Sequence, residues 1–130
     1  MFDKVGKIEA LSKKMIENNA ANINLYQRLQ ECSAVEKSQI IATVMDLLKN
    51  RRTSSTVVHL DLRNNDLKIA DLQSLAQYDG ERIEVELDSN YLEIVSEQDA
   101  KIWEDISNNP YLNLASGWHQ PVRSSSHEKF

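Results

Sequence analysis

Six ionisable side chains alternate with apolar residues in two short segments of the chain. They are His59, Asp61 and Arg63 in the first segment, and Glu84, Glu86 and Asp88 in the second. A histidine near two carboxylates provides the groups for acid–base catalysis or for binding a metal ion. A surplus of exposed carboxylates can instead bind a basic protein surface. Charges on a strand face also serve simply to prevent aggregation, so three interpretations start from the same residues.

The patterns typical of enzymes are missing from the sequence. It contains no His-x-x-x-His spacing, no pair of cysteines and no glycine-rich phosphate loop. Strand-face charges also usually lack the burial that tunes a catalytic pKa. We therefore expect a protein that is not an enzyme, with no catalytic residue, no cofactor and no metal ligand. A metal-dependent enzyme that uses Asp61, Glu86 and His59 remains the less favoured alternative.

The alternation itself predicts two strands, at residues 57–62 and 83–87, whose charged side chains share one face. Between them, Ile69, Leu72, Leu75 and Ala76 have helical spacing. A helical connection of this length allows the strands to be parallel.

In-register pairing of these strands places His59 beside Glu84, Asp61 beside Glu86, and Arg63 beside Asp88. The first and last pairs are attractive, whereas the middle pair sets two carboxylates side by side. Unpaired like charges destabilise a sheet face, so this arrangement predicts a basic counterpart on another protein.

The apolar frame around these charges is repeated. A shift of 25 residues superimposes Leu60, Leu62, Asn65 and Leu67 on Val85, Leu87, Asn90 and Leu92. Leu112 and Leu114 continue the Leu-x-Leu spacing 27 residues after Val85 and Leu87, as a degenerate third strand or a closing segment.

The repeated frame resembles leucine-rich repeats of the helix-containing kind, with two clear copies and a degenerate third. The resemblance covers residues 57–118 and departs from the family pattern at Arg82, where an apolar residue is expected. It implies that the asparagines bond backbone groups at each turn and that the strand face recognises proteins. The alternative is an unrelated α/β domain whose strands merely share Leu-x-Leu.

Helix signals surround the repeated region. Apolar spacing predicts an amphipathic helix over residues 2–15, followed by a bend at residues 18–24 and a short helix through Leu25 and Leu29. An unbroken coiled-coil helix to Leu29 is the alternative. Ser33 and Glu36 form a capping-box pattern before a helix over residues 34–49, and Ser96 caps a helix that stops before Pro110.

These elements predict one compact α/β domain, a short stack of parallel strands and helices. Residues 1–50 form a helical N-terminal cap, residues 51–118 the repeat-like region and residues 119–130 a flexible tail. Trp103 and Trp118 are expected in the core or its closing segment, or at an interface if they are exposed.

Composition limits the partners and the compartment. The net charge of −5 opposes binding to nucleic acid and to anionic lipid. Cys32 is the only cysteine, which excludes an intrachain disulfide, and no apolar run is long enough for a membrane span. We expect a cytoplasmic protein, although export by a specialised secretion system requires no recognisable signal.

Together, these features predict a noncatalytic protein-interaction module or adaptor that uses its strand face. The alternative is a small structural subunit that assembles into a larger complex through its N-terminal helices. Self-association is a further alternative, because the two ends of a short repeat stack expose apolar surface that a second molecule can cover.

Overall fold

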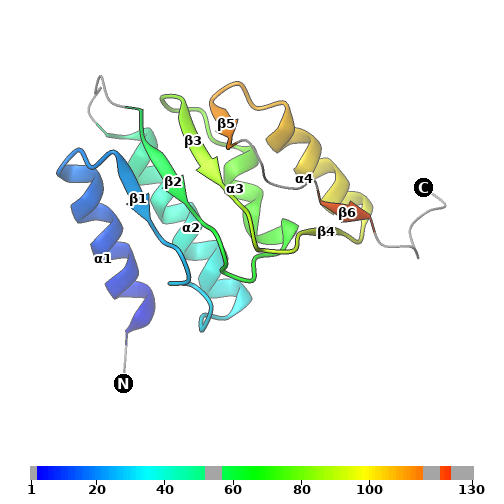
Figure 1. The fold of residues 1–130 in the computed structure, drawn as a ribbon, viewed down its shortest axis with the longest axis horizontal. Helices are drawn as coiled ribbons and strands as arrows, with labels where there is room; N and C mark the ends of the chain where they lie inside the picture. Colours follow the sequence, from blue (N-terminus) through cyan, green and yellow to red (C-terminus); the bar gives the residue numbers. More distant parts are fainter. Residues whose placement is uncertain (1–2, 52–56, 116–120, 124–130) are drawn as a thin grey trace.

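The protein, seen here as a computed structural model, is described over residues 3–51, 57–115 and 121–123 (Figure 1). Its main sheet has four parallel strands in the order β1-β2-β3-β5. They are β1 (Asn22–Asn24), β2 (His59–Asp61), β3 (Ile83–Glu86) and β5 (Leu112–Leu114). The predicted α/β class with parallel strands is therefore confirmed.

Helical connections join the strands. They are α2 (Ala34–Lys49), the 3-10 helix η1 (Ile69–Leu72) with α3 (Gln73–Ala76), and α4 (Glu97–Ser107). In Figure 1, α2 and α3 lie behind the strands, α4 lies next to α3, and α1 (Lys4–Glu17) flanks β1. The opposite face of the strands is thus free of described helices. A second, two-stranded sheet pairs β4 (Glu93–Ile94) with β6 (Val122–Arg123).

The helix starts follow the local sequence. Ser33 and Glu36 form the predicted capping box, in which each side chain accepts a hydrogen bond from the other residue's backbone N–H. The Ser96 hydroxyl likewise accepts the N–H of Asp99 at the start of α4. Trp103 in α4 is buried in the core, as its spacing predicts.

Asn65 is fully buried and holds the end of β2 against the turn that follows β1. Its Oδ1 atom accepts the N–H of Leu29 at 2.8 Å. Its Nδ2 atom donates to the carbonyl oxygens of Leu25 at 2.9 Å and Leu62 at 3.0 Å. One amide therefore satisfies three buried backbone groups that no strand ladder reaches.

Asn90 performs the same function one strand later. Its Oδ1 atom accepts the N–H groups of Asn65 at 2.8 Å and Leu67 at 3.1 Å. Its Nδ2 atom donates to the carbonyl oxygens of Leu62 at 3.0 Å and Leu87 at 2.8 Å. The two asparagines thus tie three successive turns together.

The turns also repeat in their backbone conformation. Asn64 and Asp66 have φ angles of 56° and 52°, and the residues 25 positions later, Ser89 and Tyr91, have φ angles of 60° and 52°. Gln27, in the turn after β1, has a φ of 61°. All five therefore adopt the left-handed region without a glycine, which is uncommon and costly for a residue as large as tyrosine.

The N-terminal region differs from the prediction. Asn22–Asn24 forms β1, the edge strand of the main sheet, and residues 26–31 form turns. The short helix expected through Leu25 and Leu29 is wrong, as is the unbroken helix. Three residues are too few to show a clear alternation, so the strand depends on its pairing with β2.

The degenerate third strand predicted at Leu112 and Leu114 exists as β5, but its register differs from the prediction. Leu112 pairs with Ile83, and Leu114 pairs with Val85, so the offset is 29 residues. The 27-residue alignment with Val85 and Leu87 was therefore wrong. Trp118 and most of the predicted tail lie outside the described residues, and Val122–Arg123 within that tail forms β6.

Candidate functional site

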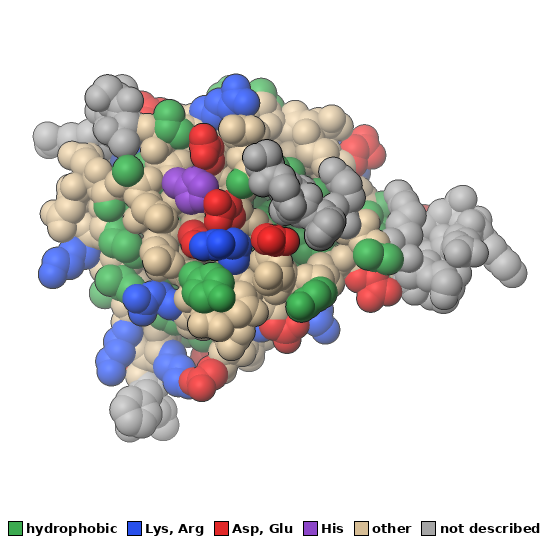
Figure 2. Space-filling model, in the orientation of Figure 1, with side chains coloured by type: hydrophobic (Ala, Val, Ile, Leu, Met, Phe, Trp, Pro, Cys, Tyr) green, Lys and Arg blue, Asp and Glu red, His purple; other side chains and the backbone are tan. Residues whose placement is uncertain are grey.

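Strands β2 and β3 bring the predicted site residues together. His59 pairs with Glu84, and Asp61 pairs with Glu86, in the predicted register. Leu60 between the charged residues is fully buried, because alternate side chains of a strand point to opposite faces. Figure 2 shows the result, with acidic, basic and histidine side chains gathered in the middle of the strand face.

Arg63 lies opposite Asp88 in the predicted register, but the predicted attraction between their side chains is wrong. The Nε atom of Arg63 lies 2.8 Å from Glu86 Oε2, and its Nη2 atom lies 2.8 Å from Asp61 Oδ2. The Asp61 side chain is only 5% exposed, and a buried carboxylate needs a charged partner more than the exposed Asp88 does. The two strands still run side by side here, since the N–H of Asn64 donates to the carbonyl of Asp88 at 3.1 Å.

His59 lies between two carboxylates. Its Nδ1 atom is 3.2 Å from Glu84 Oε2, and its Nε2 atom is 2.9 Å from Glu86 Oε1. A neutral imidazole has one N–H, whereas the imidazolium has two. Only the protonated ring can therefore donate to both carboxylates at once.

Asp61 and Glu86 were expected to be unpaired like charges side by side, and this expectation is wrong because both bind Arg63. Glu86 binds His59 through one oxygen and Arg63 through the other, while Arg63 also binds Asp61. We call this chain of side-chain contacts, from Glu84 through His59, Glu86 and Arg63 to Asp61, the strand-face network. The Arg63 guanidinium holds Asp61 and Glu86 together.

Two predicted carboxylates remain accessible at the margin of the network. The Glu84 side chain is 43% exposed, and His59 is its one partner within the described residues. Asp88 is exposed, and its side chain has no hydrogen bond or ion pair within the described part of the chain. These two carboxylates are therefore open to solvent.

Tyr26 also belongs to the site, although the sequence did not identify it. Its ring centroid lies 5.2 Å from Cζ of Arg63, a distance suited to a cation–π contact. Asn24 pairs with Asp61, so two residues further along the strands Tyr26 lies beside Arg63. Tyr26 and Arg63 are neighbours only because β1 pairs with β2, and the sequence did not predict β1.

Asp61 and Arg63 shift each other's pKa. Burial alone raises the pKa of Asp61, but hydrogen bonds from the Arg63 guanidinium and backbone outweigh burial and hold this pKa below its usual range. The hydrogen bond to Asp61 likewise raises the pKa of Arg63. The ion pair between these residues is therefore fully charged at neutral pH.

The arrangement offers little for catalysis or metal binding. Among residues 3–51, 57–115 and 121–123, no group of three His, Cys, Asp or Glu side chains could hold a metal ion. Arg63 lies where a cation between Asp61 and Glu86 would have to bind. Burial raises the pKa of the Cys32 thiol, which opposes its use as a nucleophile.

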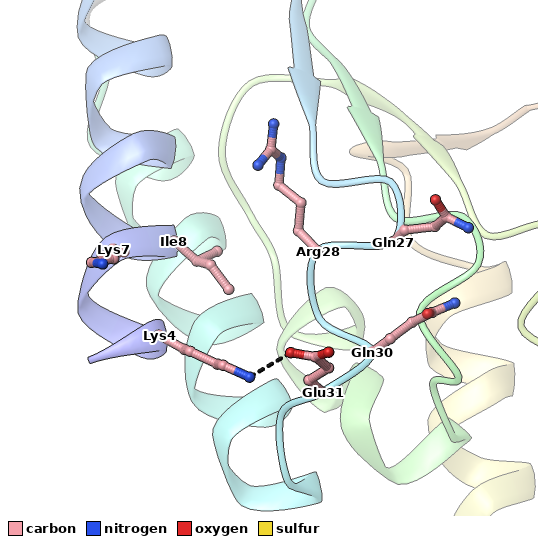
Figure 3. Close-up of a pocket in the computed structure, with 7 residues that line it drawn as sticks. All are labelled: Lys4, Lys7, Ile8, Gln27, Arg28, Gln30 and Glu31. Carbon is pink, nitrogen blue, oxygen red and sulfur yellow. Dashed lines mark hydrogen bonds and ion pairs between the residues drawn. The ribbon is translucent and has the colours of Figure 1, made fainter. Parts of the chain in front are cut away.

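A hollow of about 270 Å³ lies between α1 and the turns after β1 (Figure 3). Lys4 forms an ion pair with Glu31 at 2.5 Å across it. The labelled side chains point in different directions, with Lys7 directed away from the Lys4–Glu31 pair and Arg28 directed along β1. The basic groups therefore do not converge on one point, as an anion site requires.

No helix in the described residues is long and apolar enough to cross a membrane. Comparison with known proteins gives no match, whether to a family model, a curated protein or a solved structure.

Proposed function

We propose that the protein is a noncatalytic interaction module, an adaptor whose strand face binds a basic surface of another protein. The observation that carries this proposal is the strand-face network, which holds Glu84 on a face without described helices. Asp88, whose carboxylate is free among the described residues, follows two residues after the end of β3. A rigid, pre-organised charged surface binds with less loss of side-chain entropy than a mobile one.

The likeness to leucine-rich repeats supports the same proposal. Strand, turn and connecting helix recur, the buried Asn65 and Asn90 bond the turn backbones, and the positive φ angles return after 25 residues. We propose a short stack of this type, in which β1 adds a unit to those found in the sequence. Proteins of this family commonly recognise partners with the strand face, as the resemblance implies.

The alternative site on the N-terminal helices has weaker support. Ile16 of α1 is buried, and Val5, Ile8 and Met15 pack against the core. The apolar stripe that could bind another molecule is thus largely used to cover α2 and β1.

The proposal can be tested by reversing the two accessible charges. E84K/D88K should abolish capture of the partner while leaving the circular dichroism spectrum unchanged. The matched control is E17K/E104K, which makes the same change in net charge at exposed positions of α1 and α4. Capture followed by cross-linking and mass spectrometry identifies the partner, and equal retention by both double variants would contradict the proposal.

A further inference from the structure

His59 and a basic partner require the same carboxylate oxygens. The imidazole ring touches Glu84 through Nδ1 and Glu86 through Nε2. A lysine or arginine of the partner that binds Glu84 must therefore do so next to His59, and a protonated ring repels it. Histidine is the side chain whose charge normally changes near neutral pH.

The charged groups that face His59 come from β3 and from its own segment of the chain, and none comes from β1. From β3 it faces Glu84 and Glu86, and on its own strand Asp61 and Arg63 complete the network. From β1 its register partner is Asn22, which carries no charge. Asp61 and Arg63 neutralise each other, so the state of His59 decides how much negative charge Glu84 and Glu86 present.

Loss of the proton changes the geometry as well as the charge. A neutral ring keeps one N–H, so it can donate to Glu84 or to Glu86 but not to both. Glu86 retains Arg63 in either case, at 2.8 Å. Glu84 has no such second partner in the described residues, so it is the carboxylate that becomes unpaired when the remaining N–H donates to Glu86.

We propose that the proton on His59 and a lysine or arginine of the partner compete for Glu84, a proposal that rests on the proposed function. Docking then releases the proton to solvent, and mild acid weakens docking. His59 is therefore a positioning residue that couples partner binding to pH, and the partner contributes an exposed cation at the centre of its contact.

The experiment uses a fluorescein-labelled penta-arginine peptide as the probe and the full chain in two conditions, about pH 5.5 and about pH 7.5, where glutamate remains ionised. We expect the peptide to bind about two- to fivefold more weakly at the lower pH, the size of effect typical of one partly exposed charge. E84K/D88K should remove binding, and E17K/E104K should not.

H59Q should bind with the same affinity at both pH values, because glutamine has no charge to lose. H119Q/H127Q is the matched control, since it removes the other two histidines of the chain and should keep the pH dependence. Nitrogen NMR of His59 in the unmodified protein gives a second readout, in which adding peptide near pH 6.5 should convert imidazolium to neutral imidazole.

The outcomes separate the two proposals. Binding that needs Glu84 and Asp88 but is equal at both pH values, or peptide binding that leaves the His59 ring protonated, overturns the competition and leaves the proposed function standing. Binding that is indifferent to E84K/D88K, or absent at both pH values, overturns both proposals.

Discussion

Arg63 reaches back along its own strand to Asp61, with Nη2 of the guanidinium 2.8 Å from Oδ2 of the carboxylate. The Asp61 side chain is buried, whereas that of Arg63 is 43% exposed. A partly exposed cation therefore satisfies a buried anion, and the same cation holds Glu86. The strand face thus depends on Arg63 for its stability before any partner binds.

Replacing Arg63 by methionine should lower the free energy of unfolding by about 1–3 kcal/mol, because it leaves Asp61 buried without its partner. R63M/D61N should recover part of this loss, since the uncompensated charge is then gone. R82M is the control, at an exposed position whose side chain has no ion pair in the described residues. Urea denaturation measures all three, and an equal effect of R63M and R82M would contradict the assigned role.

The pH dependence of stability should report Asp61. Its pKa is lower in the folded protein than its usual value, so the folded state binds this proton more weakly than the unfolded state. The resulting stabilisation is complete above about pH 5 and disappears as the pH falls through the folded value, below about 4. The difference in unfolding free energy between the unmodified protein and D61N should shrink over that range, and a constant difference would refute the assignment.

Asn65→Ala should destabilise the fold by about 2–4 kcal/mol, because it leaves the N–H of Leu29 and the carbonyls of Leu25 and Leu62 without their partner. Asn113→Ala, on the exposed face of β5, removes the same amide and should change stability by less than about 0.5 kcal/mol. Chemical denaturation compares the two variants. Similar losses in both would show that burial of the Asn65 amide is unimportant.

Tyr91→Asn should stabilise the protein by about 0.5–1 kcal/mol. Tyr91 is 91% exposed and has a φ of 52°, so it gives up little packing on replacement, and asparagine tolerates this backbone region better. Tyr111→Asn is the comparison, at a partly exposed tyrosine outside the positive-φ residues. A rise in the thermal midpoint for Y91N alone supports the strain, and a fall for Y91N would exclude it.

The sequence by itself determined the helix starts at Ser33 and Ser96, the strands around Leu60 and Val85, and their 25-residue register. These features depend on capping groups and side-chain alternation within a few contiguous residues, so they can be read without knowing the neighbours. The alternation also placed His59, Asp61, Glu84 and Glu86 correctly on one face.

Only the tertiary structure decided that Asn22–Asn24 is a strand, that Leu112 pairs with Ile83, and that Arg63 binds Asp61 and Glu86. A three-residue strand has too little local pattern to be distinguished from a loop until a neighbouring strand supplies its hydrogen bonds. A long arginine can reach several carboxylates, and the choice among them follows burial, which exists only after the chain has folded. The strand face was therefore predicted as a surplus of free acids and is, in the folded protein, a connected network with two accessible carboxylates.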